Sequence, residues 1–383
     1  MRVLHVIDAL GVGGGAEHAL AVMLPLLRER GIESSVACLI PRRGGLQEAL
    51  RSQDFDVEVL PGDSLAGRSR ALRRKIRNES PDLVHATLFN SCLATRFACI
   101  GLGVAQLNSL VNTSYDPVRT AHLQIPAWKL QGVRRLDGAT ARHLGGHFHA
   151  ITETVREEAV NTFALSPDRI TVIPRGRSSM VLGERSPERR QAARLRLGLS
   201  EDAPVLLNVG RQDNQKAQTD LVHAFSKVRE HRADAVLLIA GREGDASERL
   251  HDAIVDHGLT ESVRLLGHRD DVADLYVASD LFVFPSLYEG LGSAIIEAMA
   301  LGTPVIGSDA PAIAEVLGHG SAGVVVPRGR PAALASTIIE LLDDAHARLR
   351  IGRSGRQRFE SNYELTAVAD ATEQLYRRLV QDR

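Results

Sequence analysis

The sequence predicts an α/β protein built from two doubly wound, Rossmann-like domains with parallel sheets and a helical segment at the C-terminal end. Short apolar runs of strand length alternate with helical patterns along most of the 383 residues, as expected for parallel sheets covered by helices on both faces. Glycine-bearing loops follow two of these strands, at 11–16 and 290–293. The alternation breaks at 175–200, where prolines, glycines and arginines gather, which indicates a domain boundary.

The first half of the chain reads as seven strands separated by helices. Strands are expected at 3–7, 34–40, 55–60, 81–86, 105–111, 149–152 and 170–174. Helices are expected at 17–30, around 68–77, at 90–100, around 128–135 and at 154–163. Gly31 ends the first helix as a glycine just past the last turn commonly does. We therefore predict an N-terminal Rossmann-like domain over 1–176.

The second half repeats the pattern after an expected linker at 177–200. Strands are expected at 204–209, 235–240, 263–265, 281–284, 304–307 and 323–326. The apolar run 281–284 ends at Pro285, and Gly302-Thr303-Pro304 stops the helix before the next strand. This predicts a second domain over 201–361. The remaining residues, 362–383, are expected to form a C-terminal helix that packs back on the first domain.

Composition excludes several classes of protein. The net charge is -1 and charged residues are 24%, so no global field attracts nucleic acid. Cys38, Cys92 and Cys99 lack metal-type spacing and are expected to be buried thiols in a reducing compartment. No apolar run approaches the roughly 20 residues of a membrane span, and the chain begins directly with a strand. We expect a cytoplasmic protein.

The stretch 279–308 combines a helix N-terminus that is suited to binding phosphate with two carboxylates. Gly290-Leu291-Gly292-Ser293 opens a helix, and the free N–H groups of a helix start bind phosphate readily. Glu289 precedes this loop and Glu297 lies within the helix. Positions eight apart lie about 80° apart around a helix, so the two acids would meet different parts of one extended ligand. Alternatives are a glycosidase acid–base pair and two ordinary helix-forming glutamates.

Two cations are expected beside that helix start. Arg211 directly follows the strand 204–209, and Lys216 comes five residues later. Ligands of open α/β folds bind at this carboxyl edge of the sheet. Two cations and a helix N-terminus together suit a diphosphate. The alternative is that both side chains are simply solvated in an ordinary loop.

The first glycine loop allows a second hypothesis. Gly11-x-Gly13-x-x-Ala16 is a passable dinucleotide fingerprint, and Arg42 and Arg43 end the next strand, where a 2′-phosphate would sit. Read this way, the chain is an NADP-dependent oxidoreductase. That hypothesis leaves the carboxylates and cations of the second half unexplained.

Taken together, 13–17, 209–211 with Lys216, and 289–306 resemble glycosyltransferase family 4, the group 1 glycosyltransferases. The resemblance covers nearly the whole chain, and its most specific part is the pair of glutamates separated by seven residues. It implies the GT-B fold with an interdomain cleft, and a retaining transferase. Such an enzyme moves a hexosyl group from a UDP-, GDP- or ADP-linked sugar to a small-molecule, glycan or lipid-linked acceptor, with no cofactor and no metal.

The resemblance also assigns roles. Arg211 and Lys216 would hold the donor diphosphate and stabilise the departing nucleoside diphosphate. Glu289 would bind the donor sugar and Glu297 the ribose. The other donor-binding residues that it implies are Gly14, Gly15, Gly290, Leu291, Gly292, Ser293, His268 and Arg269.

Two positions depart from the family pattern. Ala217 follows the lysine where glycine is usual, and the loop after 105–111 reads Asn112-Thr113-Ser114-Tyr115 where members often carry a histidine. Asn112 or Ser114 would replace that histidine, whereas His122 is expected on the surface. His85 either lines the acceptor side or packs in the core. The missing histidine leaves a third hypothesis, a sugar-nucleotide-binding protein without turnover.

A basic helix over 68–77 suggests weak peripheral association with the inner face of a membrane. Six of its ten residues are arginine or lysine, which suits anionic lipid and a lipid-linked acceptor. A solvated helix face is the alternative.

Overall fold

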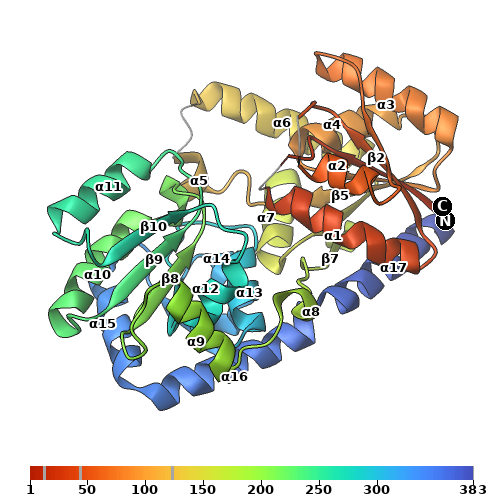
Figure 1. Cartoon of the computed structure of the whole chain (residues 1–383). Coiled ribbons are helices and arrows are strands. Elements are labelled where there is room, and N and C mark those ends of the chain that lie inside the picture. The colour runs from red at the N-terminus through yellow and green to blue at the C-terminus, as the bar shows by residue number, and fades with distance from the viewer. Residues whose placement is uncertain (12–13, 43–44, 122–124, 383) are drawn as a thin grey trace. The chain divides into compact units, whose positions relative to one another are not determined.

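The structure is a computed structural model that describes residues 1–11, 14–42, 45–121 and 125–382. It contains two compact units (Figure 1). The first comprises 1–176 and 365–383, and the second comprises 177–364. The chain therefore passes from one unit to the other twice, once in each direction.

The first unit is built on a seven-stranded parallel sheet of order β3-β2-β1-β4-β5-β6-β7. Its strands are β1 (Arg2–Ile7), β2 (Glu33–Cys38), β3 (Asp56–Val59), β4 (Leu83–Thr87), β5 (Ala105–Leu110), β6 (His147–Ala150) and β7 (Ile170–Val172). Each of the seven expected runs forms a strand. The order reverses between β1 and β4, which creates the switch point at which doubly wound folds bind ligands.

Among the described residues, eight helical elements of the N-terminal stretch and one from the C-terminal end cover this sheet. They are α1 (Gly15–Glu29), α2 (Leu46–Arg51), α3 (Leu65–Glu79), α4 (Phe89–Ala98), α5 (Pro117–Ala121), α6 (Ala127–Leu144), α7 (Glu153–Phe163), the 3₁₀ turn η1 (Pro167–Arg169) and α17 (Leu365–Gln381). The hydroxyl of Thr152 caps α7 by accepting from the N–H of Val155. α17 buries Leu375 and Tyr376 in a cluster with Val3 and Leu27. The C-terminal helix is thus part of the first unit's core.

The second unit has a six-stranded parallel sheet of order β10-β9-β8-β11-β12-β13. Its strands are β8 (Val205–Val209), β9 (Val236–Ala240), β10 (Val263–Gly267), β11 (Leu281–Phe284), β12 (Val305–Ser308) and β13 (Val324–Val326). Its helical elements are α8 (Ser179–Leu182), α9 (Pro187–Arg196), η2 (Asn214–Lys216), α10 (Gln218–His231), α11 (Ser247–Asp256), α12 (Val272–Ala278), α13 (Ser293–Ala300), α14 (Pro311–Val316), η3 (Gly318–Gly320), α15 (Pro331–Asp343) and α16 (Ala345–Asn362). Two Rossmann-like units with parallel sheets confirm the predicted fold class.

The stretch 177–200, which the sequence suggests as a linker, folds as part of the second unit. α9 packs against α12, and its arginines form ion pairs with aspartates near the ends of that helix. Arg189 lies 2.8 Å from Asp274, and Arg194 lies 2.8 Å from Asp280. The many arginines of this stretch, which suggested a solvated linker, are therefore paired with carboxylates more than 75 residues later in the sequence.

Candidate donor site

The loops after β8 and β11 meet at the carboxyl edge of the second sheet, because these two strands are neighbours. The N–H of Leu287 donates to the carbonyl of Gln215 (2.8 Å), and the Gln215 amide donates to the carbonyl of Tyr288 (2.9 Å). These bonds bring the side chains of Lys216 and Glu289 together as an ion pair. The structure therefore joins the lysine and the loop glutamate that the sequence singled out.

Lys216 is held by its surroundings and not only by Glu289. A Cβ on Gly210 would lie 3.3 Å from the lysine's Cδ, so glycine leaves room for the aliphatic stem. The ammonium lies 5.1 Å from the centroid of the Phe284 ring, a cation–π distance. Ala217 follows with φ of 48°, in the left-handed region that favours glycine. Alanine thus adopts a strained conformation at the position where the family pattern has glycine.

Arg211 lies at the same edge but is more exposed. Its Nε donates to Asp213 over 2.6 Å, and 67% of the side chain is accessible. A surface ion pair of this kind contributes little to stability. The guanidinium can therefore turn from Asp213 to an anionic ligand at low cost.

Gly292 begins α13 in a conformation that requires glycine. Its φ is 81°, and a Cβ there would lie 3.2 Å from Cδ1 of Ile295. No side chain caps this helix start. The N–H groups of the first turn, which include that of Ser293, therefore suit an anion. Gly290 and Leu291 of this loop are buried.

Glu297 is held in place by two residues that were not predicted from the sequence. The Nε of Arg177 donates to Oε1 of Glu297 over 2.7 Å, and the hydroxyl of Tyr276 lies 3.3 Å from Oε2. That hydroxyl also lies 2.9 Å from the carbonyl of Ala294 in the first turn of α13. Burial and the nearby Glu297 charge raise the pKa of Tyr276 well above its usual value. Arg177 lay in the supposed linker and Tyr276 fits an apolar helix pattern, so neither gave a signal.

His268 and Arg269 follow β10 at the same edge of the sheet. The N–H of Gly241 donates to the carbonyl of Gly267 (2.8 Å) and so joins the ends of β9 and β10. His268 lies 3.5 Å from Asp270, and Arg269 forms a two-bond pair with Asp271 at 2.6 and 2.7 Å. That pairing lowers the pKa of Asp271. Both predicted side chains thus contact neighbouring aspartates.

In the first unit, Gly14 and Gly15 form the N-terminus of α1. A Cβ on Gly14 would overlap the carboxylate of Glu17, so the Glu17 side chain would have to move to admit one. The position of a Cβ on Gly15 lies 3.7 Å from Nη1 of Arg175, a cation that the sequence analysis did not single out. Three other residues of the first unit that were singled out from the sequence, Gly13, Arg43 and His122, lie outside the described residues.

His85 is buried in a chain of hydrogen bonds across the first sheet. Its Nδ1 lies 2.5 Å from the hydroxyl of Tyr376, and its Nε2 lies 2.7 Å from Oγ of Ser109. Ser109 lies 2.9 Å from Nδ1 of His149, whose Nε2 is 2.7 Å from the carbonyl of Ile173. These groups border a cavity of about 70 Å³.

With both rings neutral, the Ile173 carbonyl sets the direction of every hydrogen bond in this series. A carbonyl only accepts, so Nε2 of His149 carries hydrogen and its Nδ1 accepts from Ser109. Ser109 then accepts from Nε2 of His85, and Tyr376 donates to Nδ1 of His85. This pattern requires two neutral rings, and burial lowers the pKa of both, that of His149 to about 4 and that of His85 well below its usual value.

Asn112 and Ser114 border a second, smaller cavity that contains an unpredicted acid. Oε1 of Glu158 accepts from the N–H of Tyr115 over 2.8 Å. Burial raises the pKa of Glu158 to about 7. A carboxylate beneath the loop 112–116 therefore stands close to the residues expected to replace the family's histidine. In the sequence it looked like an ordinary helix former.

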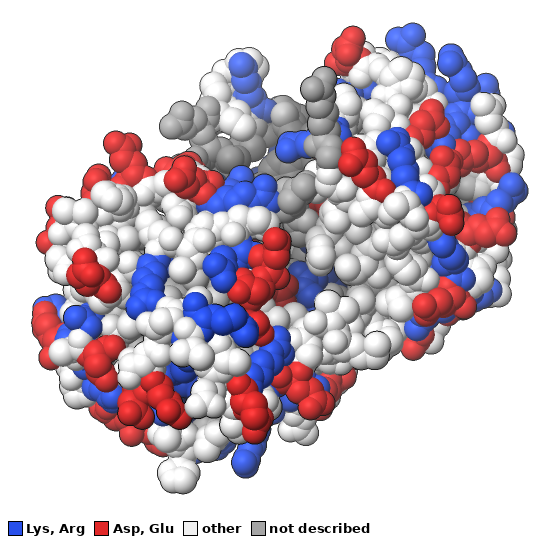
Figure 2. All heavy atoms as spheres, in the orientation of Figure 1, with Lys and Arg blue, Asp and Glu red and all other residues white. Residues whose placement is uncertain are grey.

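The basic helix α3 uses part of its charge internally. Arg73 donates to the carbonyls of Ala98 and Ile100, and the buried Lys75 pairs with Glu58 at 2.7 Å. Figure 2 shows cations and anions interspersed over the drawn face. Part of the positive charge of α3 is therefore used within the protein, which weakens the expectation that this helix docks on a membrane.

Three further observations concern the whole described chain. Within it, no group of three His, Cys, Asp or Glu side chains is placed to hold a metal ion. No described helix is both long and apolar enough to cross a bilayer. Cys38, Cys92 and Cys99 are buried free thiols.

Two family models match this sequence, one in each half of the chain. The model described as Glycosyltransferase Family 4 matches residues 13–178, and the model described as Glycosyl transferases group 1 matches residues 189–358.

Individual proteins with similar sequences or structures point to the same family. D-inositol 3-phosphate glycosyltransferase from Thermobispora bispora is 28% identical over 85% of this chain and 77% of its own length. Glycogen synthase from Mycobacterium tuberculosis is 35% identical over 48% of this chain and 44% of its own length. Among solved structures, Anabaena Alr3699/HepE in complex with UDP superimposes with a TM-score of 0.85 at 21% identity, covering 98% of this chain and 99% of its own. Sucrose-phosphate synthase from Thermosynechococcus elongatus has a TM-score of 0.82 at 22% identity, covering 100% of both chains.

Proposed function

Because this chain belongs to the group 1, family 4 glycosyltransferases and has the GT-B fold, we propose that it is a retaining hexosyltransferase. It moves a hexosyl group from a nucleoside-diphosphate sugar to an acceptor hydroxyl. The observation that carries this proposal is the Lys216–Glu289 pair beside the uncapped start of α13, with Glu297 on the same helix.

The reaction breaks the bond between the anomeric carbon and a diphosphate oxygen, and both electrons leave with the diphosphate. The acceptor oxygen bonds to the anomeric carbon, and its proton passes to the departing diphosphate. Lys216 and Arg211 stabilise the negative charge that develops there. An ammonium has three N–H donors, so the bond from Lys216 to Glu289 leaves two for phosphate oxygens.

Each carboxylate has a separate task in this proposal. Glu289, aligned by Lys216, accepts from hydroxyls of the transferred sugar. Glu297 accepts from the ribose hydroxyls, and Arg177 and Tyr276 hold it in place. The backbone at Gly290–Ser293 donates to sugar or phosphate, and the corner at His268 and Arg269 lies at the base. Gly14 and Gly15 are proposed to bind phosphate oxygens at the start of α1 in the first unit.

The donor and acceptor are proposed as classes. UDP-sugars are the first donors to test because HepE was solved with UDP, followed by GDP- and ADP-sugars. The acceptor is a small molecule, a glycan or a lipid-linked sugar. The cations of the site stand where a metal would otherwise balance the diphosphate, so we expect transfer to be independent of divalent metal and unaffected by EDTA.

We propose that α6 contacts a membrane surface. A lipid-linked acceptor would be reached at that surface. Trp128, the chain's only tryptophan, is 72% exposed, and Leu136 on the same helix is 46% exposed. Lys129, Arg134 and Arg135 share this helix, and no acidic residue occurs between Asp116 and Asp137. An exposed helix with tryptophan, apolar side chains and cations suits an anionic bilayer surface.

Trp128 also provides the assay for this contact. Vesicles of phosphatidylcholine with phosphatidylglycerol should shift its emission to the blue, and pure phosphatidylcholine should not. Reversing Arg134 and Arg135 to glutamate should abolish the shift, whereas reversing Arg74 and Arg77 on α3 should not. An unshifted spectrum with anionic vesicles would reject the proposed contact.

Turnover with a panel of nucleotide-sugars and simple acceptors tests the proposed function. A retaining enzyme gives a product with the donor's anomeric configuration, which the NMR coupling of the anomeric proton reports. Lys216→Met should reduce transfer by at least ~10-fold, since hydrogen bonds to charged groups are worth roughly 1.5–3 kcal/mol. Lys227→Met, at an exposed lysine of α10 that pairs with Glu230, is the matched control and should leave the rate unchanged.

The same experiment separates the other hypotheses. Tight donor binding without any product would support a binding protein without turnover. The oxidoreductase hypothesis relies on 11–16 with Arg42, whose side chain packs 3.1 Å from the Cβ position of Gly11. A change in NADPH fluorescence on mixing would revive it against the family evidence.

A further inference from the structure

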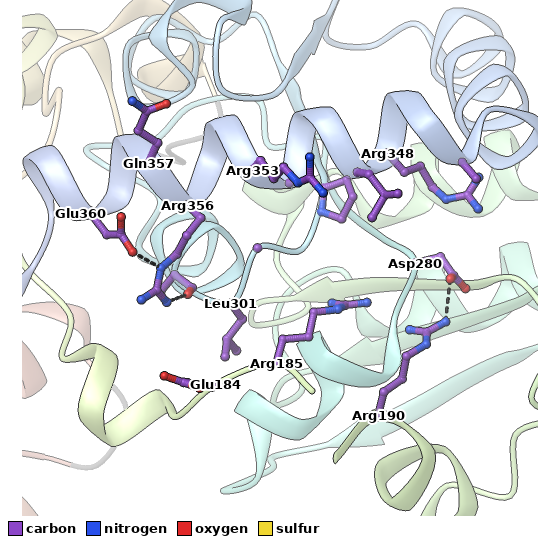
Figure 3. A pocket seen from close by; sticks show the side chains of 16 residues that line it. Glu184, Arg185, Arg190, Asp280, Leu301, Arg348, Arg353, Arg356, Gln357 and Glu360 are labelled. Atoms are coloured by element: carbon purple, nitrogen blue, oxygen red, sulfur yellow. Dashed lines mark hydrogen bonds and ion pairs between the residues drawn. The ribbon is translucent and has the colours of Figure 1, made fainter. Parts of the chain in front are cut away.

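A large pocket lies on the second unit, away from the donor site. It has a volume of about 700 Å³ and is bordered by α16 on one side and by the stretch 184–190 on the other (Figure 3). Asp280, directly before β11, and Pro304, directly before β12, form part of its lining. The pocket therefore lies at the amino edge of the sheet. The loop 290–293 follows the other end of β11, so the two sites are at opposite ends of the same strand.

The lining of this pocket carries an excess of positive charge. Five arginines border it against three carboxylates, a surplus of two positive charges: Arg185, Arg190, Arg348, Arg353 and Arg356 against Glu184, Asp280 and Glu360. The whole chain has a net charge of -1, so this surplus is local. In Figure 3 these side chains come from segments far apart in the sequence and surround one space.

Two of the carboxylates are already committed to arginines. Asp280 pairs with Arg190 at 2.7 Å and with Arg194, which does not line the pocket, at 2.8 Å. Glu360 pairs with Arg356 at 2.6 Å. Within the described chain, Arg353 has neither a hydrogen bond nor an ion pair, and it is exposed on the α16 side of the pocket. One cation at the pocket is thus available to a ligand without breaking a contact.

Arg185 supplies a half-buried cation on the opposite side. Its Nη1 donates to the carbonyl of Tyr276 and to the hydroxyl of Thr303, and its Nη2 donates to the carbonyl of Ser279 over 2.8 Å. A guanidinium has five N–H donors, so two remain. All three partners are neutral, and burial lowers the pKa of Arg185 to about 10. A cation that is partly removed from water and is not bonded to a carboxylate is stabilised strongly when an anion binds beside it.

We propose that this pocket binds the phosphate group of a small phosphorylated molecule, with Arg185 and Arg353 as its principal ligands. Arginine forks match the geometry of phosphate oxygens. The volume lies in the range of small-molecule sites, and the concave shape and local charge favour a small anion over nucleic acid. The site is independent of the nucleotide-sugar site, because none of its lining residues belongs to that site.

The Arg185 contacts suggest what binding would affect. Arg185 bonds the main chain of Tyr276, whose hydroxyl lies 3.3 Å from Glu297. A phosphate that draws Arg185 toward the pocket therefore acts on a residue that positions the proposed ribose carboxylate. A change in the donor KM on addition of phosphate would be the signature of this contact.

Calorimetric titration with inorganic phosphate tests the site, and a parallel titration with glycerol 3-phosphate distinguishes free phosphate from an organic monoester. Arg353→Glu should weaken phosphate binding by roughly tenfold or more, because one favourable charge becomes a repulsive one. This side chain is exposed and has no hydrogen-bond or ion-pair partner among the described residues, so the variant should fold. Affinity should also fall as ionic strength rises.

Two control variants make the outcome decisive. Arg350→Glu makes the same charge change on α16, at an exposed residue that does not line this pocket, and should change the affinity less than about twofold. Lys216→Met removes a phosphate ligand of the proposed donor site, so it reports any phosphate that binds there and should leave the affinity of the Arg185–Arg353 site unchanged. The proposal is overturned if millimolar phosphate does not bind the wild-type protein, if Arg350→Glu weakens binding as much as Arg353→Glu, or if Lys216→Met abolishes it.

Discussion

Acidification should unfold the first unit before the second, because buried histidines resist protonation there. Burial lowers the pKa of His5 and His149 to about 4, against about 6.5 in an unfolded chain. The folded state therefore favours the neutral rings. Their contribution to stability is intact above pH 6.5 and is lost as the pH falls toward 4.

The size of this effect follows from linkage. Between pH 7 and pH 5 the unfolded chain gains about 0.7 proton at each ring, whereas the folded chain gains about 0.1. Each histidine then costs roughly 2 kcal/mol of stability, and the pair about 4 kcal/mol. Protonation of Glu158, whose pKa burial raises to about 7, returns roughly 2 kcal/mol over the same pH range. The net loss is a sizeable share of the 5–15 kcal/mol that usually separates a folded domain from its unfolded state.

Hydrogen exchange followed by mass spectrometry measures the two units separately. The protection of peptides from β1, β4 and β6, corrected for intrinsic exchange, should fall between pH 7 and pH 5. Peptides from β8 and β9 serve as the internal reference. Among the described residues, the histidines whose pKa burial lowers all lie in the first unit.

A variant separates this cause from general acid sensitivity. His149→Gln removes one titrating ring and should reduce the pH dependence of the first unit, even if it lowers stability at pH 7. Equal loss of protection in both units, or an unchanged pH dependence in the variant, would refute the reasoning.

Three further predictions concern single side chains. Tyr276→Phe should raise the donor KM several-fold with little change in kcat, because Glu297 loses a hydrogen bond; a change in kcat alone would contradict this role. Asp137→Asn should destabilise the first unit by roughly 3–5 kcal/mol in urea unfolding, because it leaves buried Arg96 without its 2.6 Å partner; a loss under ~1 kcal/mol would be inconsistent with a buried pair. Gly292→Ala should weaken donor binding and cost about 1–2 kcal/mol of stability, because its φ is 81°; wild-type affinity would show that the loop tolerates a side chain.

Much of the fold could be predicted from the sequence because its strands are short, apolar and well punctuated. Leu281–Phe284, for example, is buried throughout, as its uninterrupted apolar character indicates. The glycines at the helix start of α13 and the cations after β8 were visible for a similar reason. Parallel strands place the loops that follow them at one edge, so residues after β8 and β11 could be expected to meet.

The remaining features depend on tertiary partners that spacing does not reveal. The arginines of α9 resembled a solvated linker because Asp274 and Asp280 lie more than 75 residues later. Arg177 could not be linked to Glu297 across 120 positions. The hydrogen-bonded series from Tyr376 to Ile173 joins the C-terminal helix to β4, β5, β6 and the residue after β7, and no local pattern indicates it.

Thermal unfolding with a panel of nucleotide-sugars tests the central claim most directly. At a concentration near 100 times Kd, a bound donor stabilises the folded protein by about 2.7 kcal/mol, which should raise the Tm by roughly 5–10 °C for a domain of this size. We predict this shift for one base class, with most of it lost in Glu297→Gln. No shift with any UDP-, GDP- or ADP-sugar, or an equal shift in wild type and Glu297→Gln, would contradict the proposed donor site.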